Sequence, residues 1–297
     1  MARKLSVTIV GPGSLGSALA QALHAAGIQI VEIVYRSPAS ASRAKALATA
    51  VGGRAIRFDE VWTPQSRSSA LLGRAGAPVP TVVWLCVGDS TIASVASEMA
   101  SRGSWKGSVV LHSSGALSAD ELSPLRRKGA KVASVHPMMT FVRSSAPSMK
   151  NVAFALEGDR AAISSARKLV KALDGYAFVL SKKDKPLYHA LGAFVSPLII
   201  AQMGAAERIG RELGLKPENT RKVIAPILQQ TIRNYIEHGP AAAFSGPIVR
   251  GDAETVRKNL AALKRVRGAQ EIYRALAKVA IEELPSKDAD AMKKIVG

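Results

Sequence analysis

Three apolar, strand-like runs of the sequence end in residues that can do chemistry. They are Val87-Gly88-Asp89 at the end of the run 81–87, His112-Ser113-Ser114-Gly115 after the run 108–111, and His136 after the run 131–135. An imidazole transfers protons or holds anions near neutral pH, and neighbouring hydroxyl and amide groups bind oxygen atoms. Because ligands of open α/β sheets bind outside the carboxyl ends of the strands, we expect these residues to line one crevice.

A second pair of ionisable residues lies further along the chain. Lys185 and His189 are four residues apart at the start of a long helical pattern, so they share one helix face. Either side chain is able to act as a general acid, which makes this face a candidate for proton transfer.

A glycine-rich turn near the N-terminus predicts the cofactor. The apolar run 5–10 leads into Gly11-Pro12-Gly13-Ser14-Leu15-Gly16, and apolar residues at helical spacing follow. In a strand-turn-helix unit, Gly11 permits the tight turn, Gly13 lets the backbone approach a pyrophosphate, and Gly16 lets helix and strand pack closely. We therefore predict a dinucleotide site that includes Ser14 and Leu15 and, from the strand end described first, Val87, Gly88 and Asp89.

The end of the next predicted strand, 29–35, indicates which dinucleotide binds. An acidic residue that would hold the ribose of NAD is missing there, and Arg36-Ser37 stands in its place. A guanidinium group and a hydroxyl group suit a 2′-phosphate, so we predict NADP(H). The alternative is that Arg36 is a solvated loop cation.

These residues together predict hydride transfer between NADP(H) and a small, anionic carbonyl or imine substrate. Lys185 or His189 would protonate or polarise the heteroatom. His112 and His136 would flank the nicotinamide or hold an anionic group, while Ser113, Ser114 and the amide of Gly115 would bind substrate oxygens. The alternative for each histidine is a structural imidazole that caps a strand end. No metal site is predicted.

Strand-like and helix-like segments alternate up to residue 180, which predicts an α/β fold with a mostly parallel sheet. Asp89 is a candidate N-cap, and the Ser/Gly/Pro-rich stretch 62–80 is expected to be a flexible excursion. From Pro186 onward the helical period dominates, with breaks at 214–217, 239–240 and 246–247. We predict a Rossmann dinucleotide-binding domain over 1–182 and an all-helical substrate and dimerisation domain over 183–297.

The segment 190–206 carries no charge, and its 17 residues approach the length of a membrane span. Pro197, Gln202 and the charged flanks weaken that interpretation. We interpret the segment as a buried helix, enclosed by neighbouring helices or by a second subunit. It therefore predicts a homodimer formed through the helical domain and no membrane partner.

The net charge of +19 raises the question of nucleic acid. The cations form short groups spread over the chain, and only 5% of the residues are aromatic, so no specific nucleic acid is predicted. A basic nucleic-acid binder stays an alternative whose affinity would fall steeply with salt. The single cysteine, Cys86, lies in a strand-like run, and no signal-type segment opens the chain, which fits a reducing cytoplasm.

The combined motifs resemble the Rossmann-like plus domain-of-unknown-function-2520 family over nearly the whole chain. They are the glycine turn 11–16, the runs 112–117 and 136–138, Tyr188-His189-Ala190, and the run 245–252. The resemblance implies an NADP-dependent oxidoreductase related to ketopantoate reductase, pyrroline-5-carboxylate reductase and the β-hydroxyacid dehydrogenases. It also implies a helical domain like the C-terminal domain of 6-phosphogluconate dehydrogenase.

The resemblance assigns further residues and shows two departures. In the related reductases a lysine and an asparagine on the first interdomain helix handle the substrate, and Lys185 matches that lysine. Pro197 stands where this family has the asparagine of a Ser-Asn pair, so only Ser196 remains; Gly88-Asp89 replaces a common Pro-Asp. We expect Ser196, Ser245 and Arg250 to face substrate. The lost amide favours the alternative of a non-catalytic NADPH-binding sensor.

Overall fold

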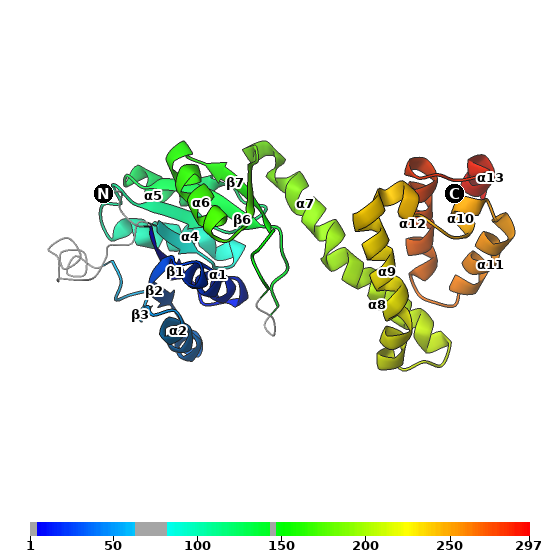
Figure 1. Ribbon diagram of the computed structural model, residues 1–297, viewed down its shortest axis with the longest axis horizontal. Coiled ribbons are helices and arrows are strands. Elements are labelled where there is room, and N and C mark those ends of the chain that lie inside the picture. The colour runs from blue at the N-terminus through cyan, green and yellow to red at the C-terminus, as the bar shows by residue number, and fades with distance from the viewer. Residues whose placement is uncertain (1–4, 63–81, 143–146) are drawn as a thin grey trace. The chain divides into compact units, whose positions relative to one another are not determined.

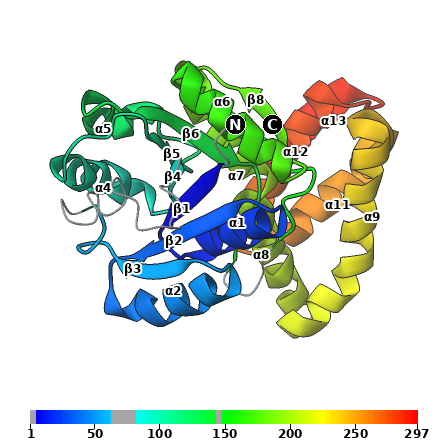
Figure 2. The same ribbon diagram turned by 60° about the vertical axis from the view of Figure 1, so that its left-hand side comes forward.

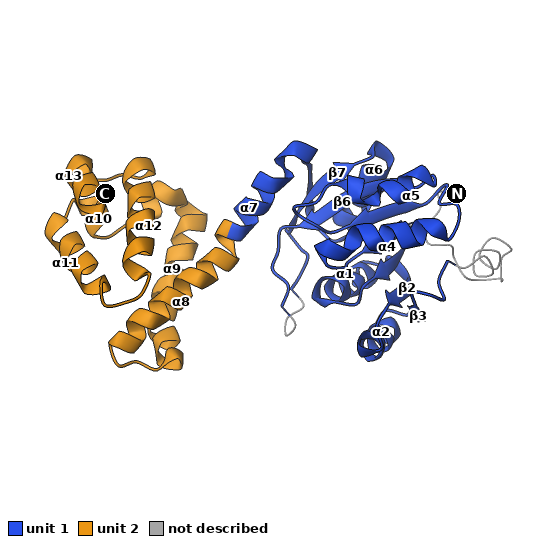
Figure 3. Ribbon diagram, turned by 180° about the vertical axis from the view of Figure 1, so that it is seen from behind, with its two compact units in different colours: residues 1–193 blue, residues 194–297 orange. Residues whose placement is uncertain are grey.

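The computed structural model describes residues 5–62, 82–142 and 147–297. The chain forms two compact units, residues 1–193 and residues 194–297 (Figure 3). The predicted boundary at 182/183 lies just before helix α7 (Lys185–Val195), whereas the compact units divide inside that helix. The predicted excursion 62–80 falls almost wholly outside the described residues.

The first unit is built on an eight-stranded sheet (Figure 1) with the order β3-β2-β1-β4-β5-β6-β7-β8. Neighbouring strands are parallel except for the antiparallel pair β6 and β7, which confirms the predicted α/β fold with a mostly parallel sheet. The strands are β1 (Ser6–Val10), β2 (Gln29–Tyr35), β3 (Arg54–Arg57), β4 (Val82–Leu85), β5 (Val109–His112), β6 (Lys131–Pro137), β7 (Ala153–Gly158) and β8 (Tyr176–Val179).

Helices cover both faces of this sheet (Figure 2). One face packs against α1 (Ser14–Ala25), α2 (Pro38–Ala50) and α6 (Arg160–Ala172). The other packs against α4 (Asp89–Ser101), the short helix η1 (Ala119–Leu122) and α5 (Ser123–Arg127). The central strands are therefore buried on both faces, as their continuous Val- and Ile-rich runs predict. Helix α7 follows β8 after a short turn, η2 (Lys182–Asp184).

The second unit is helical, as the sequence predicts. It contains α8 (Pro197–Glu212), α9 (Pro217–Ala243), α10 (Pro247–Arg250), α11 (Ala253–Leu263), α12 (Ala269–Glu283) and α13 (Ala289–Val296). Its small core joins α11, α12 and α13 through Val256, Leu260, Ala277, Ile281, Met292 and Val296. The three predicted breaks are confirmed, because α9 begins at Pro217, Gly239 has a left-handed φ of 75°, and α10 begins at Pro247.

Two local predictions need correction. Helix α2 and strand β3 are absent from the sequence-based assignment, because α2 is made of small and polar residues and buries only Ala44, Leu47 and Ala48. Asp89 is not the N-cap of α4: Gly88 holds that position, and Asp89 is the first helical residue.

The uncharged segment 190–206 is not a buried helix on the single chain. Its large apolar side chains are exposed, including Phe194 at 70% and Ile200 at 70%. Ser196 has non-helical backbone angles and separates α7 from α8, which begins at Pro197. Within the described residues, the stretch Lys182–Glu212 has the length and mean hydropathy (1.4) of a membrane span, and 6% of its most apolar window is buried. A single stretch of this kind is weak evidence for a membrane.

Candidate functional site

The glycine turn connects β1 to α1, and its three glycines differ in what surrounds them. Gly11 has a φ of 101°, and a Cβ on it would lie 2.6 Å from the carbonyl oxygen of Cys86. A Cβ on Gly16 would lie 2.1 Å from the carbonyl oxygen of Gly11. A Cβ on Gly13 would meet nothing within 4 Å, and Gly13 is the N-cap of α1. The protein itself therefore requires Gly11 and Gly16, while the space over Gly13 is open to a ligand.

Arg36 follows β2 and lies near the start of α2. Its Nη2 pairs with Oε2 of Glu98 on α4, and its guanidinium group lies 4.8 Å from the ring centroid of Phe58. Ser37 is the N-cap of α2, and its hydroxyl lies 3.0 Å from the Ser40 hydroxyl. The Arg36 side chain is 55% exposed, so solvent reaches a large part of it. Both predicted 2′-phosphate residues thus lie at the carboxyl end of β2 beside a helix N-terminus, where anions bind.

Ser114, just after β5, is the centre of a buried polar cluster. Its backbone N–H donates to Nδ1 of His112 at 3.1 Å, and its hydroxyl donates to Oδ2 of Asp89 at 2.7 Å. The same hydroxyl accepts from the backbone N–H of Leu117 at 2.9 Å. Its carbonyl oxygen accepts from the Ser134 hydroxyl at 3.0 Å. Ser114 thereby fixes the loop after β5 against β6 and α4.

Lys185, the first residue of α7, completes this cluster. Its Nζ donates to the hydroxyl oxygen of Ser134 at 2.8 Å and to the carbonyl oxygen of Ser114 at 3.2 Å. The side chain is 1% exposed, and burial lowers the pKa of its ammonium group, against the opposing effect of the Glu157 and Asp89 carboxylates. Lys185 therefore ties α7 to the sheet, and its role as the substrate acid stays a prediction.

His112 is fully buried, and both of its ring nitrogens have partners. Nδ1 accepts from the Ser114 amide, so the single proton of the neutral ring is on Nε2, which donates to the carbonyl oxygen of Ser118 at 3.0 Å. Burial lowers the pKa of His112 to about 4, which keeps the ring neutral. This geometry favours the alternative interpretation, an imidazole that caps its strand end, over contact with substrate.

His136, near the end of β6, is only partly buried and faces α7. Its Nδ1 lies 2.9 Å from the Tyr188 hydroxyl, which also lies 3.4 Å from the His136 carbonyl oxygen. A Cβ on Gly115 would lie 2.9 Å from Nε2, so the ring holds this position only over a glycine. Burial, followed by the charges of Lys185 and His189, lowers the pKa of His136 to about 4, and burial raises that of Tyr188 to about 12.

Tyr188 is a candidate functional residue to which we assigned no role from the sequence. Its ring packs edge-on against His136 and against Phe178. The usable signal was its position three residues after Lys185, on the same helix face. His189 comes next in α7 and is exposed.

The remaining predicted residues divide between the two units. Ser113 is buried, and its hydroxyl accepts from the indole N–H of Trp84 at 2.8 Å. Val87 and Gly88 connect β4 to α4, and a Cβ on Gly88 would meet nothing within 4 Å. In the second unit, Ser196 precedes α8, Ser245 precedes α10, and Arg250 ends α10. The predicted helix after Arg250 is confirmed, because Asp252 accepts from the Thr255 N–H and caps α11.

Comparison with known proteins places this architecture. The fold is similar to a candidate NADP oxidoreductase from Bacteroides fragilis, with 18% identity, a TM-score of 0.72, and coverage of 94% of this chain and 99% of that one. It is also similar to an imine reductase from Myxococcus stipitatus in complex with NADP+, with 15% identity, a TM-score of 0.63, and coverage of 98% and 100%. At these identities the likeness shows a shared fold.

A stretch of 77 residues is 34% identical to part of glutamyl-tRNA reductase from Methanopyrus kandleri. It spans 26% of this chain and only 18% of that protein. Family models match residues 66–137, as a Rossmann-like domain, and residues 152–280, as a domain of unknown function (DUF2520). The two matches follow one another along the chain, the Rossmann-like one first and the DUF2520 one second.

Proposed function

We propose that this protein is an NADP-dependent oxidoreductase that transfers a hydride between NADP(H) and a small, anionic carbonyl or imine compound. The observation that carries the proposal is the glycine turn, in which two glycines are required by the protein's own packing and Gly13 is not. A glycine with open space above it, at a helix N-terminus, is the arrangement that a pyrophosphate uses. The B. fragilis and M. stipitatus neighbours, described in terms of NADP, support the same cofactor.

The residues present fit this cofactor. Gly11, Gly13, Ser14, Leu15 and Gly16 would hold the pyrophosphate, and Arg36 with Ser37 would hold the 2′-phosphate. Val87, Gly88 and Asp89 would lie along the dinucleotide at the end of β4, where Gly88 again leaves open space. When bound, NADPH supplies the hydride; all other steps belong to side chains of the protein.

His136 would polarise the heteroatom of the substrate. We assign the Tyr188 hydroxyl as the donor to Nδ1, the shorter of its two contacts, which places the ring proton on Nε2. With its pKa near 4 the ring is neutral at pH 7, and Nε2–H can donate a hydrogen bond to the oxygen or nitrogen that gains electron density. Tyr188 would thus be a positioning residue that selects the tautomer.

His189 would supply the proton. It is exposed on α7, directly after Tyr188, and its charge is close enough to lower the pKa of His136. Lys185 would position α7, and His112 would position the loop that carries Ser114 and Gly115. The predicted substrate contacts of Ser196, Ser245 and Arg250 belong to the same proposal, and the net charge of +19 favours anionic ligands.

The first experiment measures NADPH oxidation against a panel of small keto acids, aldehydes and imines. For a substrate found in this way, His136→Asn is expected to lower kcat by about a hundredfold and to leave the Kd for NADPH unchanged, since the side chain acts on the substrate. His24→Asn, at an exposed position on α1, is the matched control. Unchanged turnover in the His136 variant would remove it from the chemistry.

A non-catalytic NADPH sensor is the second candidate. It is favoured by the internal hydrogen bonds of Lys185, His112, Ser113 and Ser114, which occupy groups that the sequence assigns to substrate. A sensor binds NADPH and oxidises it with no member of the panel, whereas the enzyme turns over at least one. A nucleic-acid binder would instead show binding that weakens steeply between 50 and 200 mM salt, as expected from about six or more phosphate contacts.

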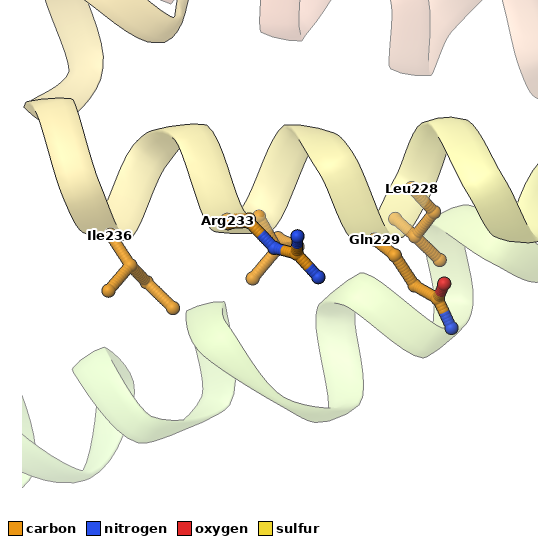
Figure 4. A pocket seen from close by; sticks show the side chains of 5 residues that line it. Leu228, Gln229, Arg233 and Ile236 are labelled. Atoms are coloured by element: carbon orange, nitrogen blue, oxygen red, sulfur yellow. The ribbon is translucent and has the colours of Figure 1, made fainter.

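We also propose that two copies associate through the helical unit. Apolar side chains on α9 are exposed, including Ile227, Tyr235 and Ile236. Leu228, Gln229, Ile232, Arg233 and Ile236 line a hollow on one side of this helix (Figure 4). A patch of this kind is typical of an interface. Sedimentation equilibrium of Ile236→Arg beside the unaltered protein tests this, with a shift from dimer to monomer expected and a monomer in both cases contradicting it.

A further inference from the structure

Glu98 connects two arginines at the edge of the predicted 2′-phosphate site. Its Oε2 pairs with Nη2 of Arg36, and its Oε1 accepts from Nη2 of Arg102 at 3.0 Å. Glu98 and Arg102 belong to α4 and the turn after it, whereas Arg36 follows β2, 62 residues earlier than Glu98. The Glu98 carboxylate is therefore already paired with the Arg36 guanidinium group, which is expected to bind the 2′-phosphate of the cofactor.

Phe58 lies against both arginines. The guanidinium carbon of Arg36 lies 4.8 Å from the centroid of the Phe58 ring, and that of Arg102 lies 5.2 Å from it. The ring is buried, and its backbone N–H donates to the carbonyl oxygen of Tyr35, the residue before Arg36. Two cations on one aromatic ring repel each other, so the Glu98 carboxylate between them offsets that repulsion.

The two arginines are held to very different degrees. Nη1 of Arg102 donates to the carbonyl oxygens of Asp59 at 3.0 Å and Val61 at 3.2 Å, and its side chain is 18% exposed. The Arg36 side chain is 55% exposed, and the contacts described for it are those with Glu98 and Phe58. Arg102 is thus the permanent partner of Glu98, and Arg36 is the exchangeable one.

We propose that Glu98 sets how strongly the protein prefers NADP(H) over NAD(H), by competing with the 2′-phosphate for Arg36. This inference rests on the proposed function. Arg36 has five N–H donors and is able to bind a phosphate while Nη2 still faces Glu98. The Glu98 carboxylate and the 2′-phosphate would then both contact Arg36, and the negative charge of the carboxylate weakens the binding of the phosphate. Release of Arg36 leaves Glu98 paired with Arg102, so the exchange leaves no carboxylate without a partner.

The direction of the effect follows from the charges. Glu98→Gln keeps the shape of the side chain and an oxygen acceptor for the arginines but removes the negative charge. Arg36 and Arg102 then lose the counter-ion that they share, and both attract a bound 2′-phosphate more strongly. An exposed ion pair of this kind corresponds to about a fivefold effect on affinity. The substitution does not change the affinity for a ligand that lacks the 2′-phosphate.

The test measures binding of 2′,5′-ADP and of 5′-AMP by calorimetry, because these two probes differ only in the 2′-phosphate and neither undergoes hydride transfer. Glu98→Gln is expected to tighten 2′,5′-ADP about fivefold and to leave 5′-AMP unchanged. In an Arg36→Ala background the same substitution is expected to give a smaller gain, because the competition for Arg36 is gone and only the change in local charge is left. Glu254→Gln is the matched control, since it changes the net charge equally in an exposed pair of the helical unit.

Each outcome decides the inference. Equal or weaker binding of 2′,5′-ADP by Glu98→Gln would overturn it and would make Glu98 a residue that orients Arg36. An equal gain for 5′-AMP, or for Glu254→Gln, would also overturn it, because the effect would then be general attraction of anions. If the unaltered protein binds neither NADPH nor 2′,5′-ADP, the proposed function itself fails, which is a different result from binding that does not depend on Glu98.

Discussion

The carboxyl ends of β5 and β6 and the carboxyl ends of β1 and β2 lie along one sheet but are built in opposite ways. After β5, Ser114 uses its N–H, carbonyl and hydroxyl groups within the protein, and Lys185 and His112 are bound to the same loop. After β1 and β2, Gly13 faces open space, and Arg36 has an exposed guanidinium group. The first region holds a fixed geometry, and the second is free to exchange partners with a ligand.

This difference separates positioning from binding. Groups that are buried and fully bonded are costly to leave unpaired, so they hold a backbone in place and rarely contact substrate. Groups with one exposed partner exchange that partner for a ligand at little cost. Substitutions at the two regions should therefore separate loss of stability from loss of binding.

The largest expected effect is on stability in acid, and it comes from the bonded region. His112 and His136 have pKa values of about 4 in the folded protein, below the ordinary value of 6.5. Between pH 6.5 and pH 4 the unfolded chain therefore binds protons that the folded protein excludes. The free energy of unfolding should fall as pH decreases through this window, by on the order of a few kcal/mol, and should not depend on these groups above it.

Urea titrations at several pH values measure this dependence. His112→Asn removes one of the two groups and should flatten the slope between pH 6.5 and pH 4, although the variant is less stable at pH 7. His24→Asn, at an exposed site on α1, should leave the slope of the unaltered protein in place. An equally steep slope in the His112 variant would mean that this histidine is not held neutral.

The next effect compares one substitution at two serines. Ser114→Ala removes the hydrogen bond to the Asp89 carboxylate and the acceptor of the Leu117 N–H, and should lower the free energy of unfolding by about 1.5 to 3 kcal/mol. Ser37→Ala removes an exposed hydroxyl whose hydrogen bond, among the described residues, is with the Ser40 hydroxyl, and should change the free energy of unfolding by less than about 0.5 kcal/mol. If urea denaturation shows that the two variants lose the same free energy of unfolding, the distinction between the two regions is wrong.

The smallest effect on stability is expected at Gly13. A Cβ there meets no protein atom, and the backbone has a negative φ of −75°, so Gly13→Ala should leave the melting temperature within about 2 °C of the original value. It should weaken NADPH binding about tenfold or more, because the methyl group occupies the space of the pyrophosphate. Gly16→Ala is the contrasting variant, expected to lose stability because its Cβ meets the Gly11 carbonyl oxygen. Full NADPH affinity in the Gly13 variant would contradict the assigned site.

The sequence predicts this sheet and its strand ends well because the signal is local. Buried Val- and Ile-rich runs and a glycine turn are read directly from neighbouring residues, and β2 has the predicted bounds, Gln29–Tyr35. Helix α2 was not predicted, because its mostly small residues show little hydrophobic periodicity. Ser37-Pro38 is nevertheless a signal for a helix start that the sequence contains.

The hydrogen-bond partners of the site residues could not be predicted from local sequence patterns. Lys185 meets Ser114 across 71 residues, and His136 meets Tyr188 across 52. Tertiary contacts decide that backbone groups bond both ring nitrogens of His112, whereas the ring of His136 bonds a tyrosine hydroxyl. The apolar segment 190–206 shows the same limit, since uniform hydrophobicity does not reveal whether its partner belongs to the same chain.

The close approach of Gly16 to the Gly11 carbonyl oxygen, which leaves no room for a Cβ, also has a kinetic consequence. A turn whose shape is set by its own backbone contacts does not have to be ordered by the ligand, so association forfeits little backbone entropy at this point. The encounter of the dinucleotide with the turn should then proceed at a rate limited by diffusion and orientation. Differences in affinity among related dinucleotides would accordingly be found in their residence times.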